Sequence, residues 1–339
     1  DVAEFYVKNG IRNHYFVSIS GYHIDEAGAN PITQAALTLS NGLTYVELFK
    51  SRGLDPDKFL RNFSWFFSNG MDPEYAVIGR VSRRIWAIAM RDLYGVGERG
   101  QKLKYHIQSS GRSLHSQEFT WNDYRTTLQA LYALADNANS LHTNSRDEAF
   151  GTPTEETVRD AVAIQLILAK EYGWLRNENP LQGSFIAESL TDEVEEKILR
   201  IFEEMNSRGG VLGSLEVNYQ RNRIQDEGMV YEHRKHTGET PIVGVNTFTD
   251  PESTAQSAEE FDIEVTRSDE NEKMMVIQRN REFRGKNSIQ SKEGVERIKQ
   301  VAREGGNLFE VMMDIVEHCS VGQVTKALFE SGGKFRRNM

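Results

Sequence analysis

Short apolar runs alternate with longer amphipathic segments along the first half of the chain. The runs at 15–20, 62–67, 103–108 and 140–143 are rich in aromatic and β-branched residues, which favours buried strands. Each run is followed by a segment in which apolar residues recur at helical spacing, and the strands recur at intervals of roughly 40 residues. This alternation predicts an α/β fold in which crossover helices join the strands of a parallel sheet.

Proline and glycine mark where the helices are expected to begin and end. A capping side chain before a proline satisfies one unpaired N–H, and the proline has no N–H to satisfy. Residues Thr152 to Glu155 also predict a capping box, because Glu155 can reach back to the cap. The predicted starts are Asn30-Pro31, Asp72-Pro73 and Thr152-Pro153, and the predicted stops are Gly53, Gly95 and Gly173.

The rhythm of the sequence changes after Gly173. The segment just before it, Thr154 to Tyr172, is apolar on most faces, so we expect that helix to be packed on more than one side. An amphipathic helix follows at 192–208, and residues 249–300 are polar, with the weakest core signal in the chain and helical pieces. We therefore expect four segments, at 1–178, 179–248, 249–300 (a polar linker or excursion) and 301–339 (a helical tail).

Composition excludes several classes of protein. Forty basic and fifty acidic residues leave a net charge of −10, which argues against a nucleic-acid surface. No stretch of about 18 uncharged apolar residues is present, so we expect no membrane-spanning segment. The one cysteine, Cys319, excludes an internal disulfide framework and a cysteine-rich zinc site, which favours a cytoplasmic protein.

Histidines recur at the ends of the predicted strands. In parallel α/β folds the reactive side chains lie beyond the carboxyl ends of the strands. His23, His106 and His142 all lie at or after such ends, so the pattern predicts a histidine-bearing rim, although each could also be a structural residue. No phosphate-binding loop, dinucleotide fingerprint, zinc-protease motif or nucleophile elbow accompanies them. The residues alone therefore indicate an α/β enzyme of unspecified substrate.

Six segments carry a resemblance to a known family. In chain order, the segments are SISGYHIDEAGA (18–29), RRIWA (83–87), YHIQSSGRSL (105–114), NSLHTNSRDEAFGTPTEE (139–156), NPLQGSF (179–185) and PIVGVNTF (241–248). They resemble the acyl-CoA mutases that use adenosylcobalamin, the methylmalonyl-CoA mutase-like family. Within that family, NENPLQGSF (177–185), YQRNRIQDE (219–227), VYEHRKHTGE (230–239) and ALFESGGKFRRNM (327–339) look most like the fused isobutyryl-CoA mutases.

The resemblance implies the C-terminal half of a (β/α)8 TIM barrel followed by a mainly helical C-terminal region. It implies a radical carbon-skeleton isomerisation of isobutyryl-CoA and n-butyryl-CoA, with adenosylcobalamin bound mainly by a domain outside this chain. His23, beside Tyr22, matches the histidine that hydrogen-bonds the substrate thioester. The other matching positions are Glu26, Gln108, Asn144 and Glu148 for the cofactor, and Ser64 and Gln108 for the substrate; no metal-ligand position matches. Arg80 is a further substrate-binding candidate from the residues alone, because an arginine on this helix can bind a phosphate, although it could also belong to a solvated basic face.

The same resemblance has departures. The first half of the barrel and the family's cobalamin-binding segment do not occur, and Tyr15 stands where relatives usually carry asparagine. The expectation is a C-terminal part or one subunit of a mutase. Its expected partners are an acyl-CoA substrate, an N-terminal barrel half, a cobalamin-binding domain or subunit and a G-protein chaperone, in a homodimer or hetero-oligomer.

Three alternatives stay open at this point. One is methylmalonyl-CoA mutase activity. Another is a metal-dependent TIM-barrel hydrolase that uses His23, His106 and His142. The third is a non-catalytic assembly or dimerisation fragment, because an open half-barrel exposes two strand edges that pair readily with another chain.

Overall fold

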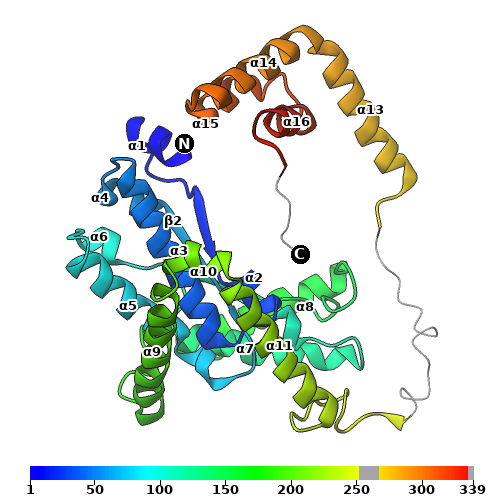
Figure 1. Cartoon of the computed structure of the whole chain (residues 1–339). Helices are drawn as coiled ribbons and strands as arrows, with labels where there is room; N and C mark the ends of the chain where they lie inside the picture. The colour runs from blue at the N-terminus through cyan, green and yellow to red at the C-terminus, as the bar shows by residue number, and fades with distance from the viewer. Residues whose placement is uncertain (252–266, 335–339) are drawn as a thin grey trace. The chain divides into compact units, whose positions relative to one another are not determined.

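The computed structural model describes residues 1–251 and 267–334. The chain forms two compact units (Figure 1). One unit is Asn13–Thr266 and contains the sheet; the other combines Asp1–Arg12 with Arg267–Met339 and is helical in its described part. These units divide the chain at other places than 178, 248 and 300, so the expected four-segment division stays a prediction.

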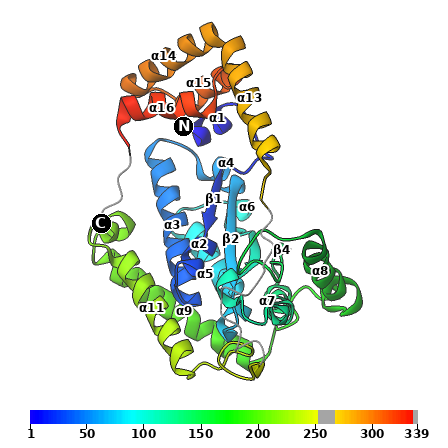
Figure 2. The ribbon, with the colours of Figure 1, turned by 90° about the vertical axis from the view of Figure 1, so that its right-hand side faces the viewer.

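A parallel sheet forms the centre of the first unit. Its strands are β1 (Val17–Ser20), β2 (Phe63–Asn69), β3 (Tyr105–Ser109) and β4 (Ser140–His142), hydrogen-bonded in that order. All three pairings are parallel, as Figure 2 shows for β1 and β2. The four expected strands are therefore confirmed, and so is the α/β class with crossover helices.

Alternate residues of the strands face a layer of helices. Ile19, Trp65, Phe67, Tyr105 and Ile107 are almost completely buried on that face. The Trp65 ring meets Trp86 of α5 edge-on at 4.7 Å, and α3 and α7 pack against the strands beside it. The opposite face of the sheet carries Phe66 and half-buried or exposed polar residues such as Ser64, His106 and Gln108, and no helix in the described part of this unit forms a layer over it, whereas parallel sheets are usually covered on both faces.

The helices of this unit follow the strands in sequence. Helix α9 packs on α3 and α5, and α10 packs on α9 and α11, so the chain after the last strand covers the outside of the helix layer. The α-helices are α2 (Tyr22–Glu26), α3 (Pro31–Ser51), α4 (Pro56–Phe59), α5 (Ile78–Asp92), α6 (Glu98–Gln101), α7 (Asn122–Ala135), α8 (Glu155–Leu166), α9 (Phe185–Asn206), α10 (Gly210–Glu216) and α11 (Tyr219–Thr237). Short 3₁₀ helices are Leu60–Asn62, Pro73–Ala76, Gly111–Ser113, Phe119–Trp121 and Trp174–Arg176.

One of the three predicted helix starts is confirmed and two are wrong. The Asn30 side chain accepts the N–H of Thr33 at 2.9 Å and caps α3. Asp72 precedes a 3₁₀ turn without a side-chain cap bond, and α5 begins only at Ile78. The cap of α8 is Thr154 and not Thr152, because Thr157 rather than Glu155 completes the capping box.

Helix α8 contradicts the expectation that it is packed on several sides. Ala161 and Ile164 are buried toward α7 and β4, as is Leu168 in the π-helical continuation Ile167–Glu171. Val158, Val162, Leu166 and Ile167 are 45–49% exposed. The physical reason is that β4 is the outermost strand of the described sheet, so no further strand or helix of this unit covers the second side.

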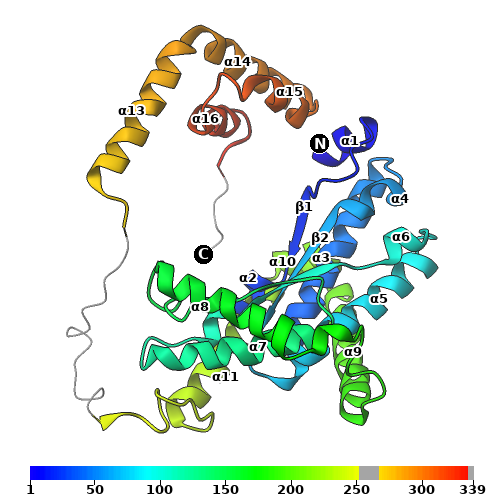
Figure 3. The ribbon, with the colours of Figure 1, turned by 180° about the vertical axis from the view of Figure 1, so that it is seen from behind.

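The second unit has a core of its own. Its helices are α1 (Val2–Lys8), α13 (Glu270–Lys286), α14 (Ser288–Glu304), α15 (Leu308–Ile315) and α16 (Val321–Gly332), drawn in Figure 3. Ile298 of α14 is fully buried with Val311, Ile315 and Cys319. The helical pieces expected within 249–300 are thus present in its described part, and α14 contributes to this core. Across residues 1–251 and 267–334, no helix is long and apolar enough to cross a membrane.

Candidate functional site

Three side chains from different strand ends form a hydrogen-bonded cluster on the open face of the sheet. Gln108, near the end of β3, donates from Nε2 to the Tyr22 hydroxyl at 3.0 Å and to Oδ1 of Asn144 at 2.9 Å. Asn144 is buried and is held in place by Ser109, which accepts its backbone N–H and its side-chain Nδ2, each at 2.8 Å. A residue of β3 and residues that follow β1 and β4 therefore meet at the carboxyl end of the sheet, where the reactive side chains of parallel α/β folds lie.

Two carboxylates border this cluster. Glu26 accepts the backbone N–H of Gly111 at 2.7 Å and, more weakly, that of Arg112 at 3.4 Å. Burial raises the pKa of Glu26, and the neighbouring Asp25 raises it further. Burial, followed by the charges of Glu26 and Glu148, raises the pKa of Tyr22, so this phenol stays protonated and can donate. Glu148 itself is exposed.

His23 lies beside this cluster but in a more open place. Its Nδ1 pairs with the Ser20 hydroxyl at 2.9 Å, and its ring meets that of Tyr22 edge-on. Tyr22 stacks on Phe66 with 5.2 Å between ring centroids, and Phe66 in turn contacts His106. A row of rings thus crosses the open face of the sheet at the level where the loops converge.

Sequence reasoning missed the residue that ties these loops together. Asp25 is 1% exposed and accepts hydrogen bonds from the hydroxyls of Tyr75 (2.5 Å), Ser110 (2.7 Å) and Ser68 (2.9 Å). Its carboxylate therefore joins the ends of β1, β2 and β3. An acid placed directly before Glu26 was a signal, but nothing in the linear sequence connects it to hydroxyls 43 to 85 residues away.

The family model described as methylmalonyl-CoA mutase matches residues 1–334. The chain belongs to the methylmalonyl-CoA mutase family. The membership applies to both compact units, because the match extends from the first helix to α16.

Individual relatives show which members of the family this chain is similar to. The chain is 60% identical over its whole length to a fused isobutyryl-CoA mutase of Geobacillus kaustophilus, and it covers 31% of that protein. It is 33% identical to the 2-hydroxyisobutanoyl-CoA mutase large subunit of Aquincola tertiaricarbonis, over 99% of this chain and 59% of the relative. It is 34% identical to a methylmalonyl-CoA mutase of Cereibacter sphaeroides, over 94% of this chain and 45% of the relative. The chain thus spans less than a third of the length of the fused relatives it matches.

Two further candidate substrate-binding positions lie outside the cluster. Ser64 is on the open face of β2, opposite Ser18 of β1 and two residues before Phe66. Arg80 lies in the helix layer, where its guanidinium forms an ion pair with Glu188 of α9 at 3.1 Å. The structure therefore places Ser64 on the same face as the cluster but does not bring Arg80 to it.

The three strand-end histidines do not form a shared site. His106 pairs with the Ser140 hydroxyl at 2.8 Å, and burial, with the nearby His142, lowers the pKa of His106. Over the described ranges, no group of three or more histidine, cysteine or acidic side chains is placed to hold a metal ion. The geometry therefore does not support the metal-dependent hydrolase that the strand-end histidines suggested.

Proposed function

We propose that this chain is the substrate-side portion of an adenosylcobalamin-dependent acyl-CoA mutase that interconverts isobutyryl-CoA and n-butyryl-CoA. The observation that carries the proposal is the meeting of Tyr22, Gln108 and Asn144 at the carboxyl ends of three parallel strands. Family membership supports the reaction class, and four fused isobutyryl-CoA mutases at 56–60% identity support the choice of substrate.

The residues present fit the cofactor that the family uses. Gly111 has no side chain at the edge of the cluster, where a Cβ would lie 3.4 Å from both carboxylate oxygens of Glu26 and 3.6 Å from Nδ2 of Asn144. The Glu26 carboxylate and the amides of Gln108 and Asn144 offer hydrogen-bond acceptors and donors here, which suit a large cofactor that carries peripheral amides and hydroxyls. Glu26, Gln108, Asn144 and Glu148 would hold it from the substrate side. When bound, adenosylcobalamin would supply a carbon-centred radical by homolysis of its cobalt–carbon bond.

His23 would orient the thioester. In the tautomer in which the Ser20 hydroxyl donates to Nδ1, the imidazole proton is on Nε2, and this nitrogen would donate to a carbonyl oxygen. A preorganised donor of this kind favours the charge that gathers on the oxygen during rearrangement, by about 3–4 kcal/mol. Tyr22 would align the substrate through its neutral hydroxyl, and Ser64 would contact the CoA chain along the open face.

This proposal requires two partners. One is the other half of the (β/α)8 barrel, and the second is a cobalamin-binding domain. Two features of the described sheet support a missing half: β1 and β4 each have one unpaired edge within the sheet, and α8 exposes a row of apolar residues beside β4. His23 is exposed in this chain, and the other half of the barrel would exclude water from it. A G-protein chaperone and a homodimer or hetero-oligomer belong to the same proposal.

A reconstitution tests the function. The chain is combined with an N-terminal barrel half and a cobalamin-binding domain taken from the Geobacillus relative, with adenosylcobalamin, and conversion of isobutyryl-CoA to n-butyryl-CoA is measured. His23→Ala is expected to lower kcat/KM by about 100- to 1,000-fold, the effect of removing one preorganised donor. His233→Ala, an exposed histidine of α11, is the matched control and should leave the rate unchanged.

The outcomes separate the alternatives. Undiminished activity in His23→Ala would refute the site assignment. Conversion of methylmalonyl-CoA in preference to isobutyryl-CoA would replace the substrate. A complete absence of isomerisation in an assembly that binds both cofactor and acyl-CoA would favour the non-catalytic assembly role. Light scattering on the isolated chain, which we expect to oligomerise through its open edges, tests that role independently.

A further inference from the structure

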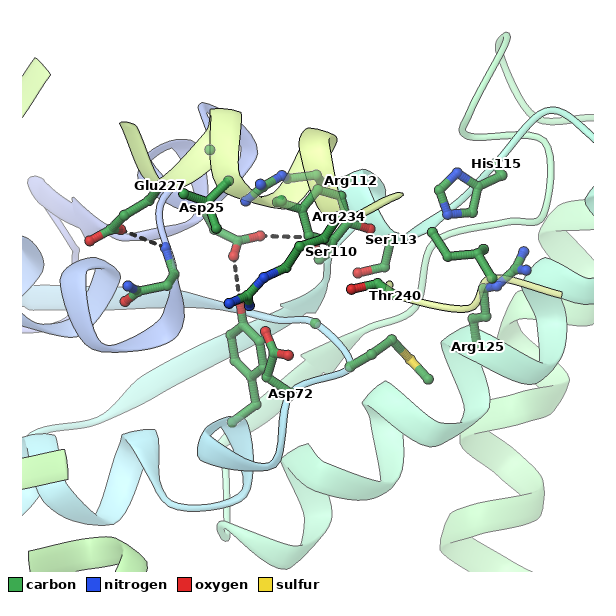
Figure 4. Close-up of a pocket in the computed structure, with 18 of the residues that line it drawn as sticks. Asp25, Asp72, Ser110, Arg112, Ser113, His115, Arg125, Glu227, Arg234 and Thr240 are labelled. Carbon is green, nitrogen blue, oxygen red and sulfur yellow. Dashed lines mark hydrogen bonds between the residues drawn. The ribbon is translucent and has the colours of Figure 1, made fainter. Parts of the chain in front are cut away.

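A cavity lies beside the loops that follow β1, β2 and β3, apart from the Tyr22–Gln108–Asn144 cluster. It has a volume of about 700 Å³, within the size range of small-molecule sites, and all of its lining residues belong to the unit Asn13–Thr266. Figure 4 shows this pocket, with α11 and residues 240–243 on one wall and the loops after β1, β2 and β3 on the other. None of Tyr22, His23, Glu26, Gln108, Asn144 or Glu148 lines it.

The adjacent acids Asp25 and Glu26 belong to opposite sides of this loop region. Asp25 lines the cavity, whereas Glu26 points to the cluster and accepts the N–H of Gly111. Ser110 stands between them, 2.7 Å from Asp25 and 3.5 Å from Glu26. The cavity is therefore a separate site that shares one loop with the cluster.

One end of the cavity holds acids together with arginines. Arg112 stacks over the Tyr231 ring at 4.4 Å, donates to the carbonyl of Ala29, and acts electrostatically on both Asp25 and Asp72. Glu227 accepts the backbone N–H of Asn30 at 2.9 Å and pairs with Arg223 at 3.2 Å on its own helix. The lining also includes Asp226 and Arg234, so this end has no excess of positive charge.

The opposite end is cationic. His115 and Arg125 lie together on the side of the pocket away from Asp25, Asp72 and Glu227 (Figure 4). The Arg125 guanidinium donates to two neutral oxygens, Oδ1 of Asn122 at 2.7 Å and the carbonyl of Val243 at 2.5 Å. His115 is 6% exposed, and the charges that act most on it are both positive, Lys235 and Arg125. The nearby carboxylate of Glu118 is occupied by Nε1 of Trp121 and the N–H of Asp250.

Between the ends, apolar side chains remain open to the cavity. Tyr124 is 66% exposed and Leu128 is 50% exposed, both on α7. Trp121, Val230 and Tyr231 complete this wall. Large apolar groups left uncovered inside a concave site are typical of a surface that a ligand covers.

We propose that this cavity binds a small phosphate monoester with an aromatic or apolar body. The phosphate lies at the cationic end, where the Arg125 guanidinium pairs with it and His115 donates a hydrogen bond from its neutral ring. Lys235 is not part of the lining and forms an ion pair with Glu232 at 3.8 Å, so it contributes only a positive field from nearby. The body packs on Trp121, Tyr124 and Leu128. The inference is independent of the mutase proposal, because its site and its residues are different.

Calorimetric titration of the 339-residue chain tests the proposal with phenyl phosphate as the probe. Inorganic phosphate supplies the charge alone and benzyl alcohol the ring alone, and we expect phenyl phosphate to bind at least tenfold more tightly than either. Benzoate, with one negative charge, should bind more weakly than phenyl phosphate. Arg125→Gln should weaken binding tenfold or more, and Arg99→Gln, an exposed arginine of α6, is the matched control and should not.

A second variant does not depend on the structural bonds of Arg125. Leu128→Trp adds bulk at a half-exposed position of the cavity wall and should abolish binding while circular dichroism stays unchanged. The proposal is overturned if phenyl phosphate binds no more tightly than inorganic phosphate or benzyl alcohol. It is equally overturned if Arg125→Gln and Leu128→Trp both retain the affinity of the unmodified chain.

Discussion

Replacing the buried carboxylate of Asp25 should destabilise the sheet-containing unit more than any single hydroxyl deletion around it. Three hydroxyl groups donate to Asp25, and all four residues are at most 3% exposed. Asp25→Ala leaves Tyr75, Ser68 and Ser110 without this acceptor, and each unsatisfied buried group costs about 1–3 kcal/mol. The serine hydroxyls can rotate toward other acceptors, so we expect a loss of about 3–5 kcal/mol in the free energy of unfolding.

The buried charge of Asp25 also costs free energy in the native protein, and its removal offsets part of the loss. Burial raises the pKa of Asp25 in spite of its three hydroxyl donors, which shows that the charged form is destabilised there. Asp25 and Tyr75 share one hydrogen bond, so removing the carboxylate and the hydroxyl together should cost less than the sum of the two single changes. Tyr75→Phe alone should cost about 1–2 kcal/mol, and it should cost almost nothing when Asp25 is already alanine.

Urea unfolding followed by tryptophan fluorescence measures both effects. All four tryptophans, at 65, 86, 121 and 174, lie in the unit Asn13–Thr266, so the signal reports that unit alone. A double-mutant cycle of Asp25→Ala and Tyr75→Phe gives the coupling. Strictly additive costs, or a loss below about 1 kcal/mol for Asp25→Ala, would refute the reasoning.

Three further predictions use the same unfolding assay. Asn30→Ala should cost about 1 kcal/mol by removing the cap of α3, whereas Asn30→Asp should retain it, and equal midpoints would contradict the cap. Helix propensity alone would make Gly79→Ala stabilising. We expect it instead to lower the free energy of unfolding by about 3 kcal/mol, because the new Cβ meets the Tyr105 hydroxyl and the Asp136 carboxylate. A stabilised variant would disprove this close approach. Burial, with Lys235 and Arg125, lowers the pKa of His115 from 6.5 to about 4, so the unfolded state binds the extra proton and stability falls as the pH drops from 6.5 to 4. The His115→Gln variant should lack this component, which amounts to at most about 1.4 kcal/mol per pH unit, and a difference between the two proteins that does not change with pH would contradict it.

The sequence pattern was sufficient for local structure but not for the composition of the cluster. The strands and most helices follow from apolar periodicity, because that periodicity decides which face of an element can be buried. The convergence of parallel strand ends predicted a rim of histidines, whereas Tyr22, Glu26, Gln108 and Asn144 were singled out by the resemblance to the mutase family. Helix starts were less certain, since Thr154 and Thr152 are equally good caps in sequence and only packing selects between them.

Contacts between residues far apart in the sequence are decided only by the tertiary structure. The linear sequence contains no sign that Asp25 accepts hydrogen bonds from hydroxyls at the ends of two other strands or that Arg80 pairs with Glu188. It also contains no sign of the cavity beside the cluster, with acids at one end and Arg125 at the other. Likewise α8 is apolar on several sides, but only the position of β4 at the end of the sheet shows which side lacks a neighbour. Sequence periodicity records whether a residue is to be buried; the partner that buries it, or that neutralises its charge, is determined by how the chain folds back on itself.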